Sequence, residues 1–349
     1  MDKLSQNHQK YMKIKNVILG SGVGGLGAGC WLKEYKEKFI IIDRLNEIPM
    51  NLHNGVHYLH SIPELPFDAK LKEITLTDGV LTEEGRIRHQ PELQDALMYS
   101  EKVRSIQHPS SIYEVGTRKS VFVPKSNSMN DYISQMVEFI GEKNFMLGAD
   151  VISIDLDRKE IIVKDKEKEQ LIEFENLVST IPLNVFLKLT KDKEFNALEF
   201  LSTPINITNF KVERIVPNWL INIYIPDPKQ KVYRLSILNN IASIESISKL
   251  EQIDYGLVKE LFRMFHISLD SPHEYSWDSG KIVSLDIDTR DKIFNHFTPM
   301  GIFLIGRFGC WNNKLLIDAT INQAKEVCKY INMEKVNKVD TENLISALL

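Results

Sequence analysis

A glycine-rich segment near the start of the chain has residue types and spacing that suit a dinucleotide. After the apolar run Val17-Ile-Leu, the sequence continues from position 20 as Gly-Ser-Gly-Val-Gly-Gly-Leu-Gly-Ala-Gly. Gly20 allows a tight turn after a strand, Gly22 lets the backbone approach a pyrophosphate, and Gly25 lets the next helix pack close to the sheet. Leu26 lies in that helix, whose N-terminus would offer free N–H groups and a positive dipole end to the phosphates.

A second apolar run, Phe39-Ile-Ile-Ile42, ends at an acidic residue. Asp43 follows the glycine turn by about 20 residues, the distance at which a carboxylate that binds the ribose is expected. We therefore place Asp43 and its neighbour Arg44 among the cofactor contacts. The alternative is that Asp43 is an ordinary turn residue at the end of a strand.

The composition limits the classes of protein that the chain can belong to. Its 349 residues suffice for one large domain or two interleaved ones, and a net charge of −4 gives no electrostatic reason to expect a nucleic-acid partner. Cys30, Cys310 and Cys328 lack the spacing of a metal site and fit a reducing compartment. Residues 1–13 are too polar for a signal peptide, and 17–32 is too short to span a membrane. We expect a soluble cytoplasmic protein without a metal site, and its oligomeric state stays open.

Hydrophobic periodicity predicts a mixture of strands and helices, which places the chain in the α/β class. Strands are predicted over 151–156, 160–164, 171–174, 177–179, 209–215, 220–225, 232–238, 282–287 and 301–305. Helices are predicted near 91–104, after the candidate N-caps Ser126 and Ser128, over about 246–265, and over about 316–327.

Three further segments carry small, histidine or arginine residues at predicted turns: Gly55-Val-His-Tyr-Leu-His60, Val178-Ser-Thr-Ile-Pro182 and Ile305-Gly-Arg-Phe-Gly-Cys-Trp311. Together with the glycine turn, they resemble the FAD-dependent amine-oxidase and protoporphyrinogen-oxidase-like superfamily. The first and third of these segments are most similar to UDP-galactopyranose mutase-like proteins. The chain departs from the mutase pattern in lacking an arginine-bearing lid and in having Cys310 where mutases usually carry an acid.

The resemblance implies a Rossmann-like FAD/NAD(P)-binding domain with an inserted α+β substrate domain. The FAD-binding domain would be discontinuous, over 14–65, 120–185 and 296–332. The substrate-binding insertions would cover 66–119 and 186–295, which leaves 1–13 and 333–349 as tails.

The resemblance also gives a role to the two histidines that follow Gly55. His60 would pack near the isoalloxazine, and His57 would support the loop. Their imidazoles could tune the flavin or move a proton near pH 7, which makes both candidate catalytic residues. The alternative is that they are loop histidines whose ring nitrogens are satisfied by backbone groups.

Two closing segments complete the expected cofactor site. The residues assigned to them are Thr180, Pro182, Gly306, Arg307 and Gly309, and Gly55 and Val151 are further candidates for binding the cofactor. Arg307 would neutralise the FAD pyrophosphate or the reduced flavin and is a candidate catalytic residue. A structural ion pair between Arg307 and Asp318 is the alternative, and Thr180 and Pro182 could merely end a strand.

The strand over 232–238 resembles the mutase strand whose arginine reaches the substrate diphosphate, and Arg234 would be that residue. Tyr224 is a candidate for the same pocket. An exposed strand arginine and a tyrosine of the core are the alternative interpretations.

These expectations favour an enzyme that binds FAD and a small molecule. One hypothesis is a mutase-like enzyme, with reduced flavin acting on a nucleotide sugar. A second is an oxidoreductase of the amine-oxidase type acting on a C–N or C–C bond. A third is a non-catalytic dinucleotide-binding protein, and the closing segments argue against a simple NAD enzyme.

Overall fold

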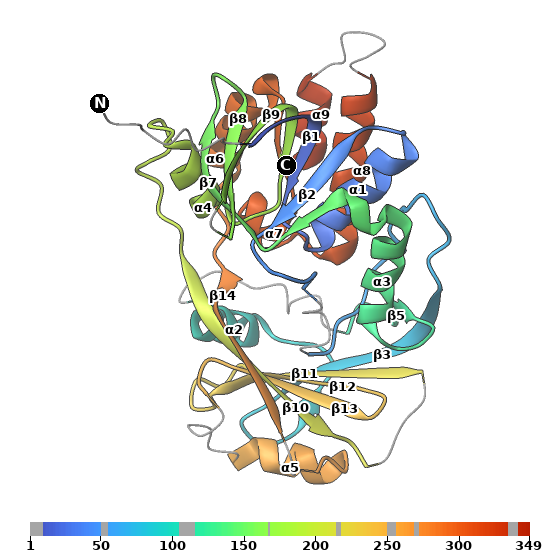
Figure 1. Cartoon of the computed structure of the whole chain (residues 1–349). Coiled ribbons are helices and arrows are strands. Elements are labelled where there is room, and N and C mark those ends of the chain that lie inside the picture. The colour runs from blue at the N-terminus through green and yellow to red at the C-terminus, as the bar shows by residue number, and fades with distance from the viewer. Residues whose placement is uncertain are drawn as a thin grey trace, which may run out of the picture.

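The computed structural model of the chain describes residues 10–49, 55–104, 116–166, 168–213, 218–249, 256–268, 272–333 and 341–349. The described residues form two β-sheets, each accompanied by helices, and the prediction of an α/β fold is confirmed. Figure 1 shows the first sheet with most of the helices at the top and the second sheet at the bottom. Strands β10 and β14 run between the two parts.

The first sheet has seven strands and contains the glycine turn. Its parallel strands are β1 (Lys10–Leu19), β2 (Phe39–Asp43), β6 (Phe145–Leu147), β9 (Lys168–Ser179) and β15 (Ile302–Leu304). An antiparallel hairpin, β7 (Ala149–Asp155) and β8 (Glu160–Asp165), pairs with the first half of β9. Strand β1 lies between β2 and β9, so its carboxyl end is at the centre of the sheet edge where ligands of such folds bind.

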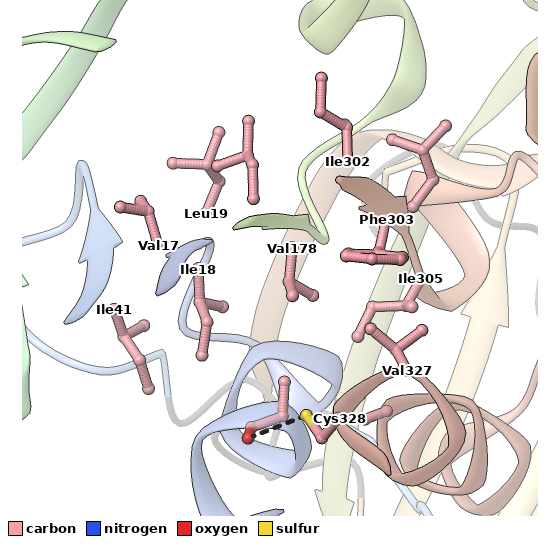
Figure 2. Packing of buried hydrophobic residues seen from close by; sticks show 14 of the residues in the cluster. Val17, Ile18, Leu19, Ile41, Val178, Ile302, Phe303, Ile305, Val327 and Cys328 are labelled. Carbon is pink, nitrogen blue, oxygen red and sulfur yellow. Dashed lines mark hydrogen bonds between the residues drawn. The ribbon is translucent and has the colours of Figure 1, made fainter. Parts of the chain in front are cut away.

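Strand β1 forms because its last residues are apolar and buried on both sides of the sheet. Val17, Ile18 and Leu19 are buried at this position, as a central parallel strand requires. Figure 2 shows them packed with Val178 of β9 and other apolar side chains. The burial fixes where β1 ends and therefore where the glycine turn begins.

Helix α1 (Val23–Glu34) follows the turn and packs on α8 (Ile317–Met333). A Cβ atom added at Gly27 would lie 3.2 Å from the Cβ of Ala324, so the small residue allows the two helices to approach closely. The Cys328 thiol donates to the carbonyl oxygen of Ala28 at 3.4 Å, as Figure 2 shows. Helix α8 is thereby held against the helix whose N-terminus faces the expected cofactor.

The remaining helices near the first sheet complete its core. They are α3 (Met129–Ile140), α4 (Leu183–Thr190), α6 (Ile287–Phe297), the single turn α7 (Gly306–Gly309) and α9 (Thr341–Leu348). Leu344, Ile345 and Leu348 of α9 are buried, and Gln323 donates to the carbonyl oxygen of Leu348 at 2.9 Å. The expectation that 333–349 is a tail is therefore wrong for residues 341–349, because α9 buries an apolar face. Likewise, residues 10–13 pair with β9 and are not a loose leader.

The second sheet has eight strands in the order β14-β10-β13-β12-β11-β3-β4, with β5 paired to β3. Their bounds are β3 (Leu71–Leu81), β4 (Ile87–Arg88), β5 (Ser120–Pro124), β10 (Ser202–Lys211), β11 (Trp219–Tyr224), β12 (Val232–Leu238), β13 (Ile241–Ser246) and β14 (His273–Ile282). Helix α5 (Gly256–Met264) covers one face, where Leu261 and Phe262 are buried. Helix α2 (Leu93–Arg104) covers part of the other face, which looks toward the first sheet (Figure 1).

Three predictions about this region need correction. The predicted helix over 246–265 is reduced to α5, since Ser246 is the last residue of β13 and residues 250–255 lie outside the described residues. The predicted strand over 282–287 is wrong, because β14 ends at Ile282 and α6 begins at Ile287. Residues 120–124, expected in the cofactor domain, belong to the second sheet through β5. The domain boundaries otherwise stay a prediction.

Candidate cofactor and substrate site

The turn between β1 and α1 is built from glycines that could not carry side chains. Gly20 has a φ of +95°, and a Cβ atom there would lie 2.4 Å from Oγ1 of Thr180. A Cβ atom at Gly25 would lie 1.9 Å from the carbonyl oxygen of Gly20. At Gly22, by contrast, an added Cβ atom meets nothing within 4 Å. The space beside the N-terminus of α1 is therefore open, as a site for a pyrophosphate requires.

Asp43 connects this turn to the end of β2. Its Oδ2 accepts from the backbone N–H and the hydroxyl of Ser21, both at 2.7 Å, and its Oδ1 accepts from the N–H of Leu45 at 2.9 Å. The carboxylate thus lies beside the open space, where the ribose contact is predicted. Its hydrogen bonds to Ser21 and Leu45 also stabilise the two turns, which is the alternative role of a turn residue. The side chain of Arg44 is exposed.

The two predicted closing segments meet the turn at the carboxyl ends of β1, β9 and β15. The hydroxyl of Thr180 donates to the carbonyl oxygen of Leu19 at 2.8 Å, and the N–H of Ile305 donates to the carbonyl oxygen of Ser179 at 3.0 Å. Gly309 packs on Ser179, to whose carbonyl oxygen an added Cβ would lie at 2.9 Å.

Three other predicted cofactor residues have defined places around these strand ends. Pro182 is the N-cap residue of α4. Gly306 has a φ of +80°, and its N–H donates to Oε1 of Gln323 at 3.0 Å. Val151 lies in the β7–β8 hairpin, paired with Val163. The cofactor roles of all these residues stay predictions.

The segment 55–60, which we call the histidine segment, lies between the second sheet and α8. Leu59 exchanges two backbone hydrogen bonds of 2.9 Å with Phe122 of β5. At the other end, the N–H and hydroxyl of Ser61 donate to Oδ2 of Asp318 in α8, at 2.9 and 2.6 Å. These contacts fix the chain on both sides of His60, whose ring stacks on that of Tyr58 with centroids 5.3 Å apart.

His57 faces several positive charges in the same region. Burial, followed by repulsion from Arg234, Arg307 and Lys281, lowers the pKa of His57 from its ordinary 6.5 to about 3. The imidazole is therefore neutral at physiological pH and can serve as a hydrogen-bond partner. A role for His57 in moving a proton by titrating near pH 7 is not supported.

Four basic side chains from four elements lie close enough together for some of them to lower the pKa of others, and three of them, all but Arg104, also act on His57. We call them the basic cluster: Arg104 of α2, Arg234 of β12, Lys281 of β14 and Arg307 of α7. Burial lowers the pKa of Arg307 to about 10, aided by repulsion from Arg104 and Arg234, which leaves it charged at neutral pH. Burial, followed by repulsion from the three arginines, places the pKa of Lys281 well below its ordinary value.

One buried carboxylate pairs with this cluster in the described part of the chain. Glu245 of β13 forms an ion pair with Arg234, and its other oxygen lies 3.2 Å from Nζ of Lys281. The side chain of Arg234 is 17% exposed, so the alternative of an exposed strand arginine is wrong. Arg307 donates through Nε to the carbonyl oxygen of Leu315 at 3.1 Å, and the alternative of an ion pair with Asp318 is not seen among the described residues, where Asp318 accepts from Ser61.

Tyr224 lies directly beside Arg234 in the sheet register. Its ring meets that of Tyr99 of α2 edge to face, with centroids 5.7 Å apart, and Tyr99 meets Tyr233 in the same way at 6.0 Å. The predicted association of Tyr224 with Arg234 is thus present in space, and core packing also contributes to its position.

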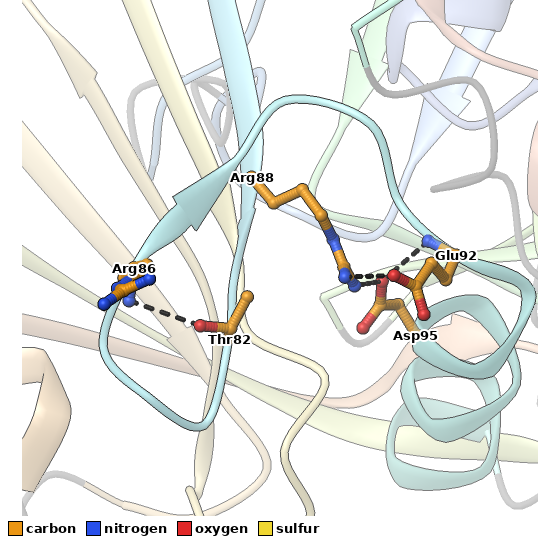
Figure 3. Close-up of polar contacts among 5 residues, drawn as sticks. All are labelled: Thr82, Arg86, Arg88, Glu92 and Asp95. Atoms are coloured by element: carbon orange, nitrogen blue, oxygen red, sulfur yellow. Dashed lines mark hydrogen bonds and ion pairs between the residues drawn. The ribbon is translucent and has the colours of Figure 1, made fainter.

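Helix α2 is held over the sheet by two sets of polar contacts that bring Arg104 to the cluster. Figure 3 shows Arg88, at the end of β4, paired with Glu92 and Asp95 at the start of α2. Near the other end, Lys102 donates to three backbone carbonyl oxygens, those of Ile225, Asp227 and Val232, at 2.7–2.8 Å. Burial lowers the pKa of Lys102 to about 7.

Sequence reasoning missed three members of this arrangement: Arg104, Glu245 and Lys281. The only sequence signal for Arg104 was a basic residue in the last turn of a predicted helix, which is common at helix ends. Glu245 and Lys281 lie in strands that were not predicted.

The structure contains no group of three or more His, Cys, Asp or Glu side chains placed to hold a metal, as far as the described residues extend. None of the described helices combines the length and apolar character needed to cross a bilayer.

Comparisons with known proteins give a fold and no family. No family model and no curated protein matches the sequence. Among solved structures, a reduced UDP-galactopyranose mutase is 14% identical with a TM-score of 0.66, over 96% of this chain and 97% of that one. A protein described as a protoporphyrinogen oxidase from an Exiguobacterium species is 11% identical with a TM-score of 0.60, over 93% and 99%. A fatty acid isomerase from P. acnes is 12% identical with a TM-score of 0.57, over 91% and 98%. The chain shares the fold of these proteins over nearly its whole length.

The electrostatics of His57 predict a distinct dependence of stability on pH. Because its pKa in the folded state is about 3, below the ordinary 6.5, the unfolded chain takes up a proton between these values that the folded chain does not. The fold is therefore most stable, as far as His57 is concerned, above about pH 6.5, and it loses stability as the pH falls toward 3. The free energy of unfolding of the wild type should therefore fall relative to that of a His57→Gln variant, by about 1.4 kcal/mol per pH unit once the slope is fully developed.

Denaturant unfolding at several pH values from 4 to 7 checks this prediction. His273→Gln is the matched control, since it makes the same substitution at an exposed histidine of β14. A difference between wild type and His57→Gln that does not vary with pH would show that His57 does not titrate abnormally.

Proposed function

We propose that the chain is a FAD-dependent enzyme whose substrate is an anionic small molecule. The observation that carries the proposal is the position of the basic cluster, because it lies next to segments that also form the dinucleotide turn. Arg307 in particular follows β15, whose partner β9 ends just before Thr180, the residue that lies beside Gly20. A cofactor on the turn and an anion on the cluster would therefore be neighbours.

The residues present fit FAD in three respects. Gly22 leaves open space at the N-terminus of α1, Asp43 reaches the side of that space, and Arg307 is a buried cation with its Nε held by a carbonyl oxygen. The first two would hold the pyrophosphate and a ribose, and the third would neutralise negative charge on the cofactor or on its reduced form. Bound FAD would supply the redox chemistry or, when reduced, the nucleophile.

The protein's own residues would bind and orient the substrate. Arg234 is positioned by Glu245 and can present its remaining donors to a phosphate or carboxylate in a fixed plane. The pKa of Lys281 is lowered by burial and by the three arginines, and a bound anion would raise it again, since an opposite charge favours the charged amine. The neutral imidazole of His57 would accept or donate one hydrogen bond without adding charge.

Within this proposal, the first candidate reaction is that of a mutase-like enzyme on a nucleotide sugar. Arg234 would bind the diphosphate, as the resemblance of its strand implies, and Arg104 and Lys281 would share the charge. A diphosphate carries more than one negative charge, which matches a cluster of four basic groups with a single carboxylate partner better than a simple neutral substrate would.

A second candidate, an oxidoreductase acting on a C–N or C–C bond, is favoured by Cys310. This residue stands where mutases usually carry an acid, and its thiol approaches the carbonyl oxygen of Leu304 at 3.3 Å. Burial raises the pKa of Cys310 to about 12, so the thiol supplies no acid or base near neutral pH. The position thus offers no substitute for the missing acid.

The Gly22→Val variant tests the cofactor site. Because nothing lies within 4 Å of the added Cβ atom and the φ of Gly22 is −68°, the variant should fold but fill the space for the pyrophosphate. We expect purified wild type to show flavin absorbance that bleaches with dithionite, and the variant to retain less than about a tenth of the flavin, a loss of at least 1.4 kcal/mol in binding.

The thermal unfolding midpoint of the FAD-free forms is the control for folding, and Gly25→Ala gives the contrast. Its Cβ atom would lie 1.9 Å from a backbone oxygen, so that variant should lose stability itself. Normal flavin content in Gly22→Val, or a wild type that takes up no FAD, would contradict the cofactor assignment.

Removal of Arg234 tests the anion site. In the double variant Arg234→Met/Glu245→Gln, the arginine and its buried partner are neutralised together, so that no unpaired carboxylate is left behind. We expect UDP to bind at least about tenfold more weakly, a loss of about 1.4 kcal/mol, with flavin content unchanged. Arg86→Met, which removes an exposed arginine of the β3–β4 turn (Figure 3), should leave UDP binding as it is.

Incubation of the flavin-loaded protein with UDP-galactopyranose, with and without dithionite, distinguishes the two candidate reactions. Conversion only after reduction supports the mutase-like reaction. Absence of conversion, together with bleaching of the flavin by another anionic substrate and recovery in air, supports the oxidoreductase. Equal UDP affinity in wild type and the double variant would remove Arg234 from the substrate site.

A further inference from the structure

Lys281 of β14 is the member of the basic cluster whose contacts differ most from those of a structural lysine. Its Nζ lies 3.2 Å from Oε2 of Glu245 and 5.2 Å from the centre of the Tyr233 ring. In the part of the chain that the structure describes, Glu245 is its one polar contact, although an ammonium group has three protons to donate. Lys102, by contrast, donates to three backbone carbonyl oxygens. The amine of Lys281 therefore keeps capacity for a ligand, whereas that of Lys102 is fully used by the fold.

An irregularity in β14 brings Lys281 to this place. Trp277 of β14 pairs with Ile205 of β10. Lys281 follows Trp277 by four residues, yet it pairs with Thr203, only two residues from Ile205. Gly280 makes the irregularity possible, because a Cβ atom there would lie 1.7 Å from the side chain of Ile205. Bulges of this kind are common next to active sites, where they redirect a side chain.

Arg234 lies beside a second irregularity, in β12. Val232 pairs with Ser246, and the next pair is Arg234 with Glu245, so that β12 has one residue more than β13 at this point. Arg234 contacts one oxygen of the Glu245 carboxylate, and Lys281 lies beside the other. The guanidinium and the amine are thus no farther apart than one carboxylate can span. A small ligand that contacts both must carry its anionic group directly beside the atom that meets Nζ.

The basic surroundings of Lys281 also favour the nucleophilic form of its amine. Burial, followed by repulsion from Arg234, Arg307 and Arg104, lowers the pKa of this amine well below its ordinary 10.5. At a given pH, a larger fraction of it is therefore neutral than in an exposed lysine, and only the neutral amine has the lone pair that attacks a carbonyl carbon. A lysine desolvated beside other cations is one arrangement by which enzymes activate an amine for imine formation.

Glu245 is placed to move the protons that such a reaction requires. Its side chain is 7% exposed, and one of its oxygens is occupied by Arg234. The other oxygen, Oε2, forms no hydrogen bond among the described residues and lies 3.2 Å from Nζ of Lys281. A general base acts over distances of about 2.6–3.2 Å. Nucleophile, base and a cation for the substrate anion thus lie together on one face of the second sheet.

We propose that Lys281 forms an imine with the carbonyl group of a 2-oxo acid whose carboxylate is bound by Arg234. The neutral amine adds to the carbonyl carbon, and Glu245 carries one amine proton to the carbonyl oxygen. Glu245 then carries the second amine proton to the resulting hydroxyl group, which leaves as water as the C=N bond forms. Amine and ketone give imine and water, so the step consumes no oxidant or reductant.

The ligand class follows from the arrangement of Arg234 and Lys281. In a 2-oxo acid the carboxylate is attached directly to the carbonyl carbon, as contact with both side chains requires. A simple ketone brings no charge to oppose the arginines, and a sugar in its ring form has no free carbonyl group. The carboxylate also stabilises the protonated imine by attraction once this has formed. The inference rests on the anion site of the proposed function and adds a covalent step that this function does not require.

Reductive trapping on the purified, flavin-loaded protein tests the imine. Cyanoborohydride reduces an imine to a stable amine, so that pyruvate bound in this way stays attached to its lysine, which peptide mass mapping identifies. We expect Lys281 to be labelled at least about tenfold faster than Lys102 or the exposed Lys229, since a hydrogen bond from a charged group to the carboxylate contributes about that factor or more. The labelling rate of Lys281 should also level off at a lower pH than that of exposed lysines.

Lys102 is the matched control within the same protein. Burial lowers its pKa too, to about 7, but its amine already has three carbonyl partners and no arginine positioned for a carboxylate. Acetone, a ketone without a carboxylate, is the matched probe and should label Lys281 no faster than exposed lysines. The double variant Arg234→Met/Glu245→Gln keeps Lys281 and removes both helpers, so pyruvate should label it at least about tenfold more slowly. The thermal unfolding midpoint shows whether that variant is folded.

The outcomes separate this inference from the proposed function. If Lys281 stays unlabelled by pyruvate while UDP binds, the imine is overturned and the anion site stands. Equal labelling of Lys281 and Lys102, or labelling of Lys281 by acetone as fast as by pyruvate, would overturn the selectivity for a 2-oxo acid. If wild type binds neither UDP nor pyruvate, the anion site fails and the imine with it. Labelling of Lys281 that needs the carboxylate of pyruvate and is slowed in the folded double variant supports the inference.

Discussion

The close approach of α1 to the turn before it and to α8 behind it is the constraint on which the site depends. Gly25 packs on the carbonyl oxygen of Gly20, at a distance that no side chain could occupy, and Gly27 lets α8 lie against α1. Helix α8 then reaches outward with two polar side chains. Asp318 holds the histidine segment through Ser61, and Gln323 holds Gly306 and with it the turn that carries Arg307. One helix–helix contact therefore sets the dinucleotide turn, the histidine segment and one cation of the basic cluster in a fixed relation.

The basic cluster is the second constraint, and it opposes folding. Burial of like charges costs free energy, which the structure offsets in part through Glu245 and in part through the neutral form of His57 and the lowered pKa of Lys281. The remaining cost is the one that an anionic ligand removes when it binds. A site arranged in this way gains affinity for anions from repulsion that is already present in the free protein, and ligand binding should also stabilise the fold.

The sequence predicts a part of the site correctly where the residues of that part lie close together along the chain. The glycine turn, the strand before it and Asp43 lie within one βαβ unit, so spacing alone indicated their arrangement. The strand predicted over 232–238 is β12, and the sheet register places its Arg234 beside Tyr224. By contrast, β14 carries Lys281 in a run of polar and aromatic residues without clear alternation, and its strand forms because β10 offers a paired edge. Glu245 was missed because no element was predicted over β13, a short strand whose conformation is decided by pairing with its two neighbours, β10 and β12.

The same distinction explains why a shared fold leaves the substrate open. The neighbours match nearly the whole chain at 11–14% identity, which is enough to preserve the layers and the turn. Substrate chemistry is determined instead by the side chains on one face of the second sheet, and these can change without any change in strand order. In this chain two of the four basic groups, Arg234 and Lys281, and their carboxylate partner Glu245 belong to that sheet. Replacement of these three residues would alter the charge that the sheet presents to a substrate and would leave the strand order as it is.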